Sequence, residues 1–135
     1  MRFLYAKKVE YFFKSKLKFP ETFLLKRRSL RYYKKGTEKE IRILSELVDR
    51  NKASIDIGVY RGIYSYFLSG LSTFVYAFEA NPLLFPKLID SFSNKKNINI
   101  ENCAVSNSSG STTLKIPIRD SNENQDLEQK YNLLK

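Results

Sequence analysis

Residues 53–62 read Ala-Ser-Ile-Asp-Ile-Gly-Val-Tyr-Arg-Gly, a short strand pattern that runs into a turn bounded by two glycines. Gly58 can adopt backbone angles that other residues avoid, so the chain can pass close to a ligand there. Gly62 lets a helix begin tightly after the strand, with its free N–H groups directed at the turn. Asp56 adds a carboxylate beside them. This stretch predicts a strand, a sharp turn and a helix, with a ligand at the turn.

The alternation of strand and helix continues beyond this turn. Residues 63–68 suit a short helix stopped by Gly70, residues 73–78 are the most strand-like in the chain, and residues 97–105 form a third strand pattern. Between the last two, Asn81-Pro82 is typical of a helix start. One buried stripe is expected on that helix, made by Phe85, Leu88, Ile89 and Phe92.

Strands and helices that alternate with short connections predict a parallel sheet with right-handed crossovers. Ligands of such sheets bind beyond the carboxyl ends of the strands, where the strand order reverses. We therefore expect an α/β, Rossmann-like fold, with a partial parallel sheet preceded by N-terminal helices.

Glu79 follows Gly58 by 21 residues and lies at the tip of the predicted second strand. A carboxylate there is placed to accept hydrogen bonds from ribose hydroxyls, which fits either a dinucleotide or S-adenosylmethionine. A dinucleotide turn needs a glycine where Tyr60 stands, so NAD is disfavoured. The acid in front of the turn, Asp56, suits a cationic ligand such as the sulfonium of S-adenosylmethionine. The competing interpretation is a turn without a ligand, with Glu79 capping the helix that follows.

Three ordered motifs within residues 50–118 resemble the FkbM-type S-adenosylmethionine-dependent methyltransferases, which have a class I Rossmann-like fold. They are Ser54-Ile-Asp-Ile-Gly-Val-Tyr-Arg-Gly-Ile-Tyr-Ser-Tyr66, Val75-Tyr-Ala-Phe-Glu-Ala-Asn-Pro82, and Asn102-Cys-Ala-Val-Ser106 with Gly110. The resemblance implies that Asp56, Gly58 and Gly62 line the methionine end of the cofactor. It also implies that Glu79 holds the ribose and that Asn102 to Ala104 lie near the adenine.

The chain departs from the family pattern in two places. Val59-Tyr60 replaces the usual Ala-Asn, which keeps the glycine frame and makes Tyr60 part of the cofactor pocket wall. The family also continues with an acidic strand and further elements that close the acceptor side of the pocket, and these 135 residues contain no such segment. We therefore expect a C-terminally truncated methyltransferase half, for which cofactor binding is a firmer expectation than turnover.

The basic charge belongs to the N-terminal third of the chain. Residues 1–50 hold 15 Lys and Arg against 6 Asp and Glu, whereas residues 51–135 hold 9 against 8. We expect residues 1–50 to be a separate basic helical segment, with a helix over 3–18 and another from Thr37, whose capping box with Glu40 would start it. Its role is open between a solvated face and peripheral membrane contact through residues 1–35, while no nucleic-acid motif is present.

The C-terminal part is expected to hold one more strand, residues 112–118, which Pro117 would place at a sheet edge. Residues 119–135 form a polar tail. An exposed edge of this kind would favour dimerisation, so a homo-oligomer is one expectation.

Composition excludes several other classes of protein. The chain has no histidine and a single cysteine, Cys103, which excludes an internal disulfide and leaves no plausible zinc site. No apolar run is long enough to span a bilayer and the N-terminus does not resemble a signal peptide, so a cytoplasmic location is expected. No residue can be named as a catalytic base.

Two functions follow from these features. The first is S-adenosylmethionine-dependent methyl transfer to an oxygen of a small molecule or glycan. The alternative is a catalytically incomplete, methyltransferase-like binding module whose basic N-terminus docks to a membrane surface or a partner.

Overall fold

A computed structural model of the protein describes residues 19–36, 38–117 and 126–134. The predicted helix over residues 3–18 lies outside these ranges. Two helices come first, α2 (Glu21–Lys35) and α3 (Glu40–Leu47), followed by β1 (Ser54–Ile57), α4 (Ile63–Leu71), β2 (Val75–Phe78), α5 (Phe85–Phe92) and β3 (Ile98–Glu101). A second group of strands contains β4 (Ala104–Val105), β5 (Gly110–Pro117) and β6 (Asp126–Leu134).

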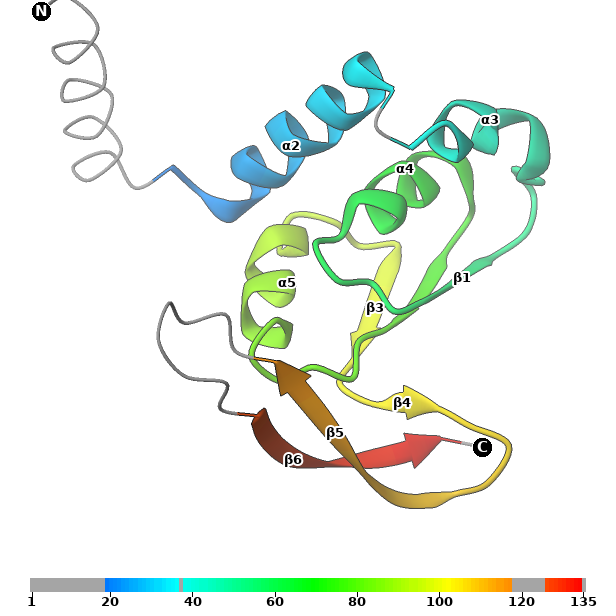
Figure 1. The fold of residues 1–135 in the computed structure, drawn as a ribbon. Helices are drawn as coiled ribbons and strands as arrows, with labels where there is room; N and C mark the ends of the chain where they lie inside the picture. The colour runs from blue at the N-terminus through cyan, green and yellow to red at the C-terminus, as the bar shows by residue number, and fades with distance from the viewer. Residues whose placement is uncertain (1–18, 37, 118–125, 135) are drawn as a thin grey trace, which may run out of the picture.

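The first sheet is parallel and has the order β1-β2-β3, with Ser54 opposite Val75 and Val75 opposite Ile98. The predicted α/β class, with a partial parallel sheet preceded by helices, is confirmed. Helix α4 packs against β1 and β2, and α5 packs against β3 (Figure 1). Because the strand order is β1-β2-β3, β2 is the central strand, and β1 and β3 are the edge strands among the described residues.

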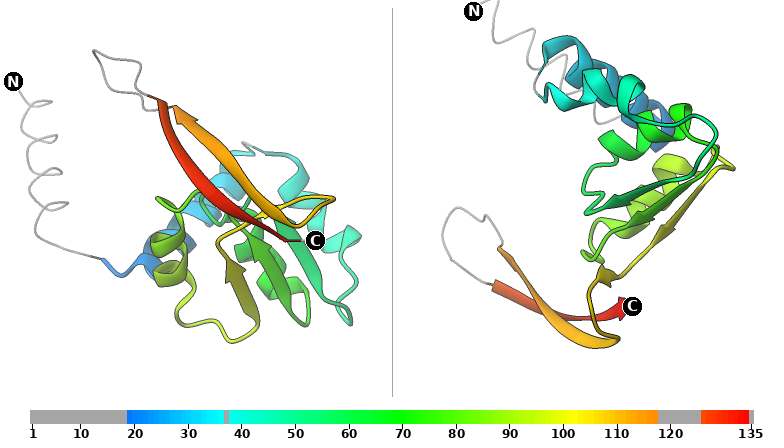
Figure 2. Two further views of the ribbon diagram at one scale, coloured as in Figure 1. Left: turned by 90° about the horizontal axis from the view of Figure 1, so that it is seen from below. Right: turned by 90° about the vertical axis from the view of Figure 1, so that its right-hand side faces the viewer.

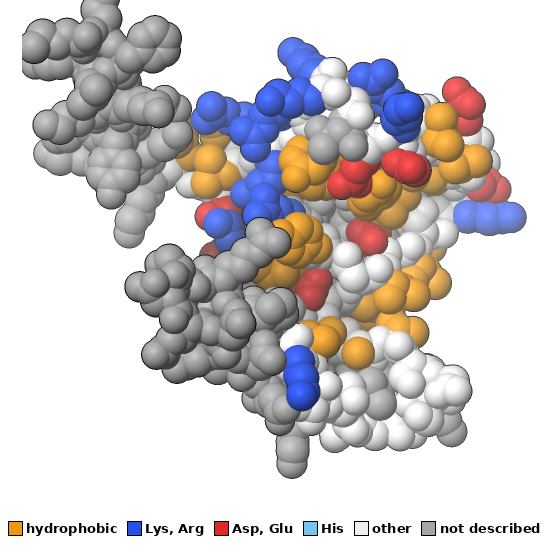
Figure 3. All heavy atoms as spheres, viewed as in Figure 1, with side chains coloured by type: hydrophobic (Ala, Val, Ile, Leu, Met, Phe, Trp, Pro, Cys, Tyr) orange, Lys and Arg blue, Asp and Glu red, His pale blue; other side chains and the backbone are white. Residues whose placement is uncertain are grey.

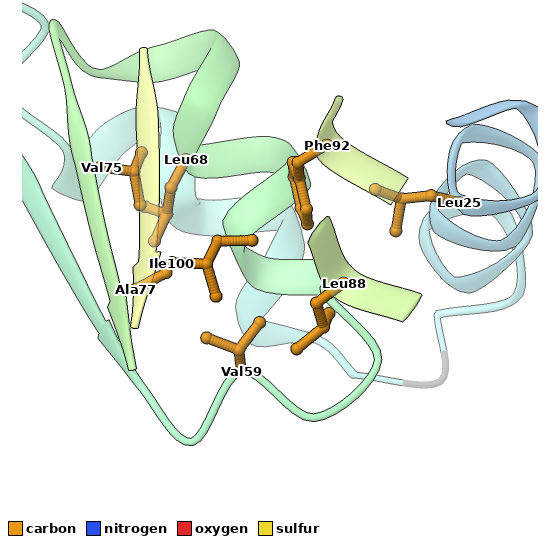
Figure 4. Packing of buried hydrophobic residues seen from close by; sticks show 8 residues of the cluster. All are labelled: Leu25, Val59, Leu68, Val75, Ala77, Leu88, Phe92 and Ile100. Atoms are coloured by element: carbon orange, nitrogen blue, oxygen red, sulfur yellow. The ribbon is translucent and has the colours of Figure 1, made fainter. Parts of the chain in front are cut away.

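The core lies between this sheet and its helices (Figure 4). Alternation along each strand sends every second side chain to the helical side, so Val75, Ala77 and Ile100 are buried there. Their partners come from the helices and the glycine turn, and the whole cluster is Leu25, Val59, Leu68, Val75, Ala77, Leu88, Phe92 and Ile100. Leu25 belongs to α2, so this helix is anchored as an outer layer on α4 and α5.

The other side of the sheet is open to solvent. Ile55 and Ile57 of β1 are 66% and 62% exposed, and Tyr76 of β2 is also exposed. These residues alternate with the buried set, and Ile55 lies directly opposite Tyr76 in the register. Figure 2 shows the helices of the described chain on one side of the strands only. The sheet therefore has one covered face and one apolar face in contact with water.

The second sheet has the order β4-β6-β5, in which β5 and β6 are antiparallel and β4 and β6 are parallel. The sequence predicted one strand over residues 97–105. Instead β3 ends at Glu101, and β4 begins at Ala104 in the other sheet. The predicted edge position of Pro117 is confirmed, because β5 is an outer strand. Strand β6 lies in the segment that sequence alone described only as a polar tail.

Several predicted helix details were wrong. Helix α3 begins at Glu40 with Lys39 at its N-cap position, so the expected start at Thr37, which lies outside the described residues, is not observed. In this helix Ile41 is buried, whereas Leu47 near its C-terminal end is 71% exposed. Helix α5 begins at Phe85 after a separate turn. Ile89, expected in its buried stripe, is exposed, and Ser91 is buried in its place.

None of the helices in the described ranges combines the length and the apolar character required to cross a bilayer.

Candidate functional site

The turn between β1 and α4 has an unusual backbone. Gly58 and Gly62 have φ values of 84° and 78°, and Tyr60 between them has φ 51°. Among the described non-glycine residues, Tyr60 alone has a positive φ. The turn is fastened to the sheet because the N–H groups of Gly58 and Val59 both donate to the carbonyl of Phe78. The predicted role of the glycines as conformational requirements is consistent with these angles.

Gly62 is also required by packing. A Cβ atom at this position would lie 2.9 Å from Cε2 of Phe92 and 3.3 Å from Cδ2 of Leu88. At Gly58, a Cβ atom would meet nothing within 4 Å. Gly62 therefore allows the turn to sit directly on α5, whereas Gly58 faces open space at the carboxyl edge of β1.

Glu79 connects the end of β2 to this turn. Its Oε2 accepts the N–H of Tyr60 at 2.6 Å, and its Oε1 accepts the N–H of Asn81 at 2.7 Å. The side chain is only 6% exposed. Both carboxylate oxygens thus stabilise the backbone of two loops. Glu79 does not cap the following helix as the competing interpretation expected, because α5 begins only at Phe85 and has no side-chain cap. A carboxylate offers about four lone-pair positions, so these two bonds leave acceptor capacity for a hydroxyl.

Asp56 points to the helical side of the sheet, because alternation in β1 places it there. Its Oδ2 accepts the hydroxyl of Ser65 at 2.5 Å, and the backbone N–H of Ser65 is a further donor. Ser65 is in the first turn of α4, so Asp56 joins β1 to the start of that helix. Burial raises the pKa of Asp56, the bonds from Ser65 oppose this rise, and the charge of Glu79 adds to it. The two carboxylates are therefore close enough to sense each other.

Asn102 lies beside the same edge. Its Nδ2 donates to the backbone carbonyl of Glu79 at 2.7 Å, and the N–H of Glu79 donates to the carbonyl of Glu101. Ala104, predicted to accompany Asn102 near an adenine, begins β4 in the second sheet two residues further along the chain. The structure thus brings together Asp56, Gly58, Tyr60, Gly62, Glu79 and Asn102, and the place of Ala104 near an adenine stays a prediction.

A cavity of about 350 Å³ flanks the turn on the side of α2 and α5. Sequence analysis missed it, because its walls come from three distant segments. Its lining residues are Arg28, Tyr60, Arg61, Leu84, Lys87, Leu88 and Ser91. Tyr60 is 56% exposed and so belongs to both the turn and the cavity rim.

The remaining reactive groups have structural explanations. Cys103 is buried and burial raises the pKa of its thiol, which fits an inert thiol better than a nucleophile. Burial and a hydrogen bond with Glu38 raise the pKa of Tyr64 to about 12. Within the described ranges, no group of three or more His, Cys, Asp or Glu side chains could hold a metal ion.

No family model and no curated protein matches the chain. Three solved structures are similar to about half of it. The 23S rRNA methyltransferase ErmE is 22% identical with a TM-score of 0.44, and the match covers 48% of this chain and 28% of that one. An rRNA methylase from Streptococcus thermophilus is 25% identical with a TM-score of 0.45, and the match covers 49% and 41% of the two chains. A methyltransferase-type protein from Streptococcus mutans in complex with SAH is 28% identical with a TM-score of 0.46, and the match covers 50% and 40%. The matched part spans less than half the length of each of these proteins.

Proposed function

We propose that this chain binds S-adenosylmethionine at the carboxyl edge of β1 and β2, as the cofactor half of a methyltransferase of the FkbM type. The observation that carries the proposal is the convergence of Asp56, Glu79 and Asn102 around the turn at residues 58–62. Parallel sheets bind ligands at this edge. The two carboxylates suit the positive charges of the sulfonium and amino groups, and Glu79 retains lone pairs for ribose hydroxyls.

S-adenosylmethionine, when bound, supplies a methyl group on a positively charged sulfur. The methyl group would pass to an acceptor oxygen as its bond to sulfur breaks, and the acceptor proton would leave to solvent or to a base that these residues do not identify. The contribution of this chain is positioning. The rigid turn holds the methionine end, Glu79 holds the ribose, and a fixed alignment of acceptor and donor supplies much of the rate of such a transfer.

Calorimetric titration of the full chain with S-adenosylmethionine and S-adenosylhomocysteine tests the proposal. Glu79→Gln should weaken binding about tenfold, the effect of one lost charged hydrogen bond. Glu101→Gln is the matched control, because it removes a carboxylate at the end of β3 that bonds only Asn99 among the described residues, and it should change affinity less than twofold. A folded chain that binds neither ligand at millimolar concentration would refute the proposal. If the chain bound NAD more tightly than either ligand, the cofactor would be NAD instead of S-adenosylmethionine.

The acceptor is proposed to be a hydroxyl of a small molecule or glycan, and the site of action the cytoplasm. Incubation of the chain with labelled S-adenosylmethionine and an acceptor panel, including RNA, would test this directly. Label transferred to RNA alone would contradict the small-molecule assignment.

A second candidate function, a membrane-docking module, is favoured by the outward face of α2. Phe23, Leu30 and Tyr33 of α2 are exposed, as is Phe19 just before the helix, and exposed basic residues such as Lys26 and Lys34 lie among them in the sequence. Figure 3 shows Lys and Arg side chains gathered over this helix. Apolar and basic side chains on one helix are typical of contact with anionic bilayers. Co-sedimentation with anionic vesicles, compared with neutral ones, tests this function. Equal recovery with both would refute it.

A further inference from the structure

Three cationic side chains from three separate elements line the cavity beside the turn. Arg28 comes from α2, Arg61 from the turn itself and Lys87 from α5. Arg28 is half-buried. Like charges brought together repel, and this repulsion grows as the surroundings become less polar. The arrangement is therefore expected to attract an anion.

The contacts of these groups leave most of their positive charge available. Arg28 Nη1 donates to the backbone carbonyl of Arg61 at 3.3 Å, which uses one of its five donors and no carboxylate. Arg61 stacks its guanidinium group 5.2 Å from the ring centroid of Tyr60. Lys87 Nζ lies 3.4 Å from Oε1 of Glu21, so this one cation is partly neutralised. Within the described ranges, neither arginine forms an ion pair with a carboxylate.

The rest of the lining is Tyr60, Leu84, Leu88 and Ser91, so it is mostly apolar or aromatic. A volume of about 350 Å³ is at the small end of the range for ligand pockets. Two arginines favour a phosphate group, because their planar forks match its oxygens. The cavity therefore combines cations that can bind a phosphate with apolar and aromatic side chains that can contact a ring or short apolar group.

We propose that this cavity binds the phosphate group of a small phosphate ester, with Arg28, Arg61 and Lys87 as its ligands and Tyr60 beside the organic part. Anion binding here does not depend on the cofactor. Tyr60 and Arg61 also belong to the turn at the proposed cofactor site. The phosphate ester is therefore the methyl acceptor, an assignment that rests on the proposed function.

Titration of the full chain with phenyl phosphate, in a buffer free of phosphate, tests this proposal. Phenol and inorganic phosphate serve as half-ligands. Arg28→Gln should weaken the binding of phenyl phosphate about tenfold, as expected for the loss of charged hydrogen bonds. Arg31→Gln is the matched control, because it removes an equal charge from an exposed position on the same helix. Lys87→Gln and exposed Lys96→Gln form a second pair, and circular dichroism checks that each variant is folded.

Each outcome decides between alternatives. Weakening by Arg28→Gln and Lys87→Gln but not by their controls supports the cavity. Equal weakening by all four, or no binding by folded wild type at millimolar phenyl phosphate, overturns it. Anionic vesicles and polyuridylate are added as competitors. The concentration of lipid or RNA phosphate that displaces phenyl phosphate from the wild type is compared with the concentration of inorganic phosphate that does so. If a far lower concentration suffices for the vesicles or for polyuridylate, the ligand is a lipid or RNA phosphate. The small-ester assignment is then overturned.

The same titrations separate this inference from the proposed function. Binding of S-adenosylhomocysteine without phenyl phosphate refutes the phosphate cavity alone. Binding of phenyl phosphate without S-adenosylhomocysteine leaves the cavity and refutes the cofactor proposal.

Discussion

The carboxylate of Glu79 accepts the backbone N–H of Tyr60 at 2.6 Å, and this bond joins the end of β2 to the turn after β1. The second carboxylate oxygen holds the N–H of Asn81 at the start of the next loop. One side chain therefore fixes the relative positions of two loops at the carboxyl edge of the sheet. A ligand that bonds Glu79 would meet an acceptor that is already oriented.

Replacement of Glu79 by Ala should destabilise the chain by about 3 kcal/mol, because two N–H groups lose their partner in a site with little access to water. Urea unfolding measures the change. Glu101→Ala, which removes an acid from the end of the neighbouring strand, should cost far less. Similar losses for the two variants would show that the bonds of Glu79 are unimportant for stability.

Gly62→Ala should destabilise more than Gly58→Ala. Both substitutions place a side chain at positive φ, which costs roughly 1–2 kcal/mol. Only at Gly62 does the new Cβ also approach Phe92, at 2.9 Å, and overpacking of this kind adds about 1–3 kcal/mol. Thermal or urea unfolding of both variants gives the comparison. Equal destabilisation would contradict the close packing of the turn on α5.

Tyr60→Gly should leave stability unchanged or raise it by up to about 1 kcal/mol. The substitution removes the strain of a tyrosine at φ 51°, at the loss of an exposed contact with Arg61. Tyr60→Asn should be similarly mild, since asparagine tolerates this region. Tyr60→Val is the contrasting variant, because a β-branched residue is poorly tolerated there. If valine proved as stable as glycine, the positive φ would be refuted.

The buried carboxyl of Asp56 makes stability depend on pH. Its folded pKa is raised above the ordinary value of 3.8, so at pH values between the unfolded and folded pKa the folded chain binds more protons than the unfolded chain. The contribution of Asp56 to the free energy of unfolding is therefore largest at low pH and falls as pH rises through this interval. Asp56→Asn abolishes this dependence.

Urea unfolding of wild type and Asp56→Asn at several pH values above 3.8 measures it. The difference in unfolding free energy should shift in favour of the variant as pH rises. Asp90→Asn, on the exposed part of α5, is the control. A difference that does not change with pH would contradict the raised pKa of Asp56.

The first sheet and its turn could be predicted because their signals are local. Residues 53–62 contain the strand, both glycines and the acid within one short stretch, and the strand at 75–78 is marked by its β-branched and aromatic residues. Strand β6 could not be predicted, because its polar sequence is held by pairing with β5 rather than by its own pattern.

At the site, sequence identified which residues would gather but not what they would bond. Asp56 and Glu79 were found from their positions at strand ends, whereas the bonds from Ser65 and Tyr60 depend on how close two loops come. The start of a new strand at Ala104 could not be predicted, because nothing local marks the end of β3 at Glu101. The grouping of the cations around the cavity could not be predicted from sequence, because Arg28 and Arg61 are separated by 33 residues.

The open face of the first sheet has a thermodynamic consequence. Ile55 and Ile57 are already hydrated in the folded chain, so their apolar surface is not newly exposed when the chain unfolds. The heat capacity change of unfolding scales with newly exposed apolar area, and a typical domain shows about 12–15 cal/mol/K per residue. This chain should therefore have a smaller value and a flatter curve of stability against temperature than a domain whose sheet is covered on both sides.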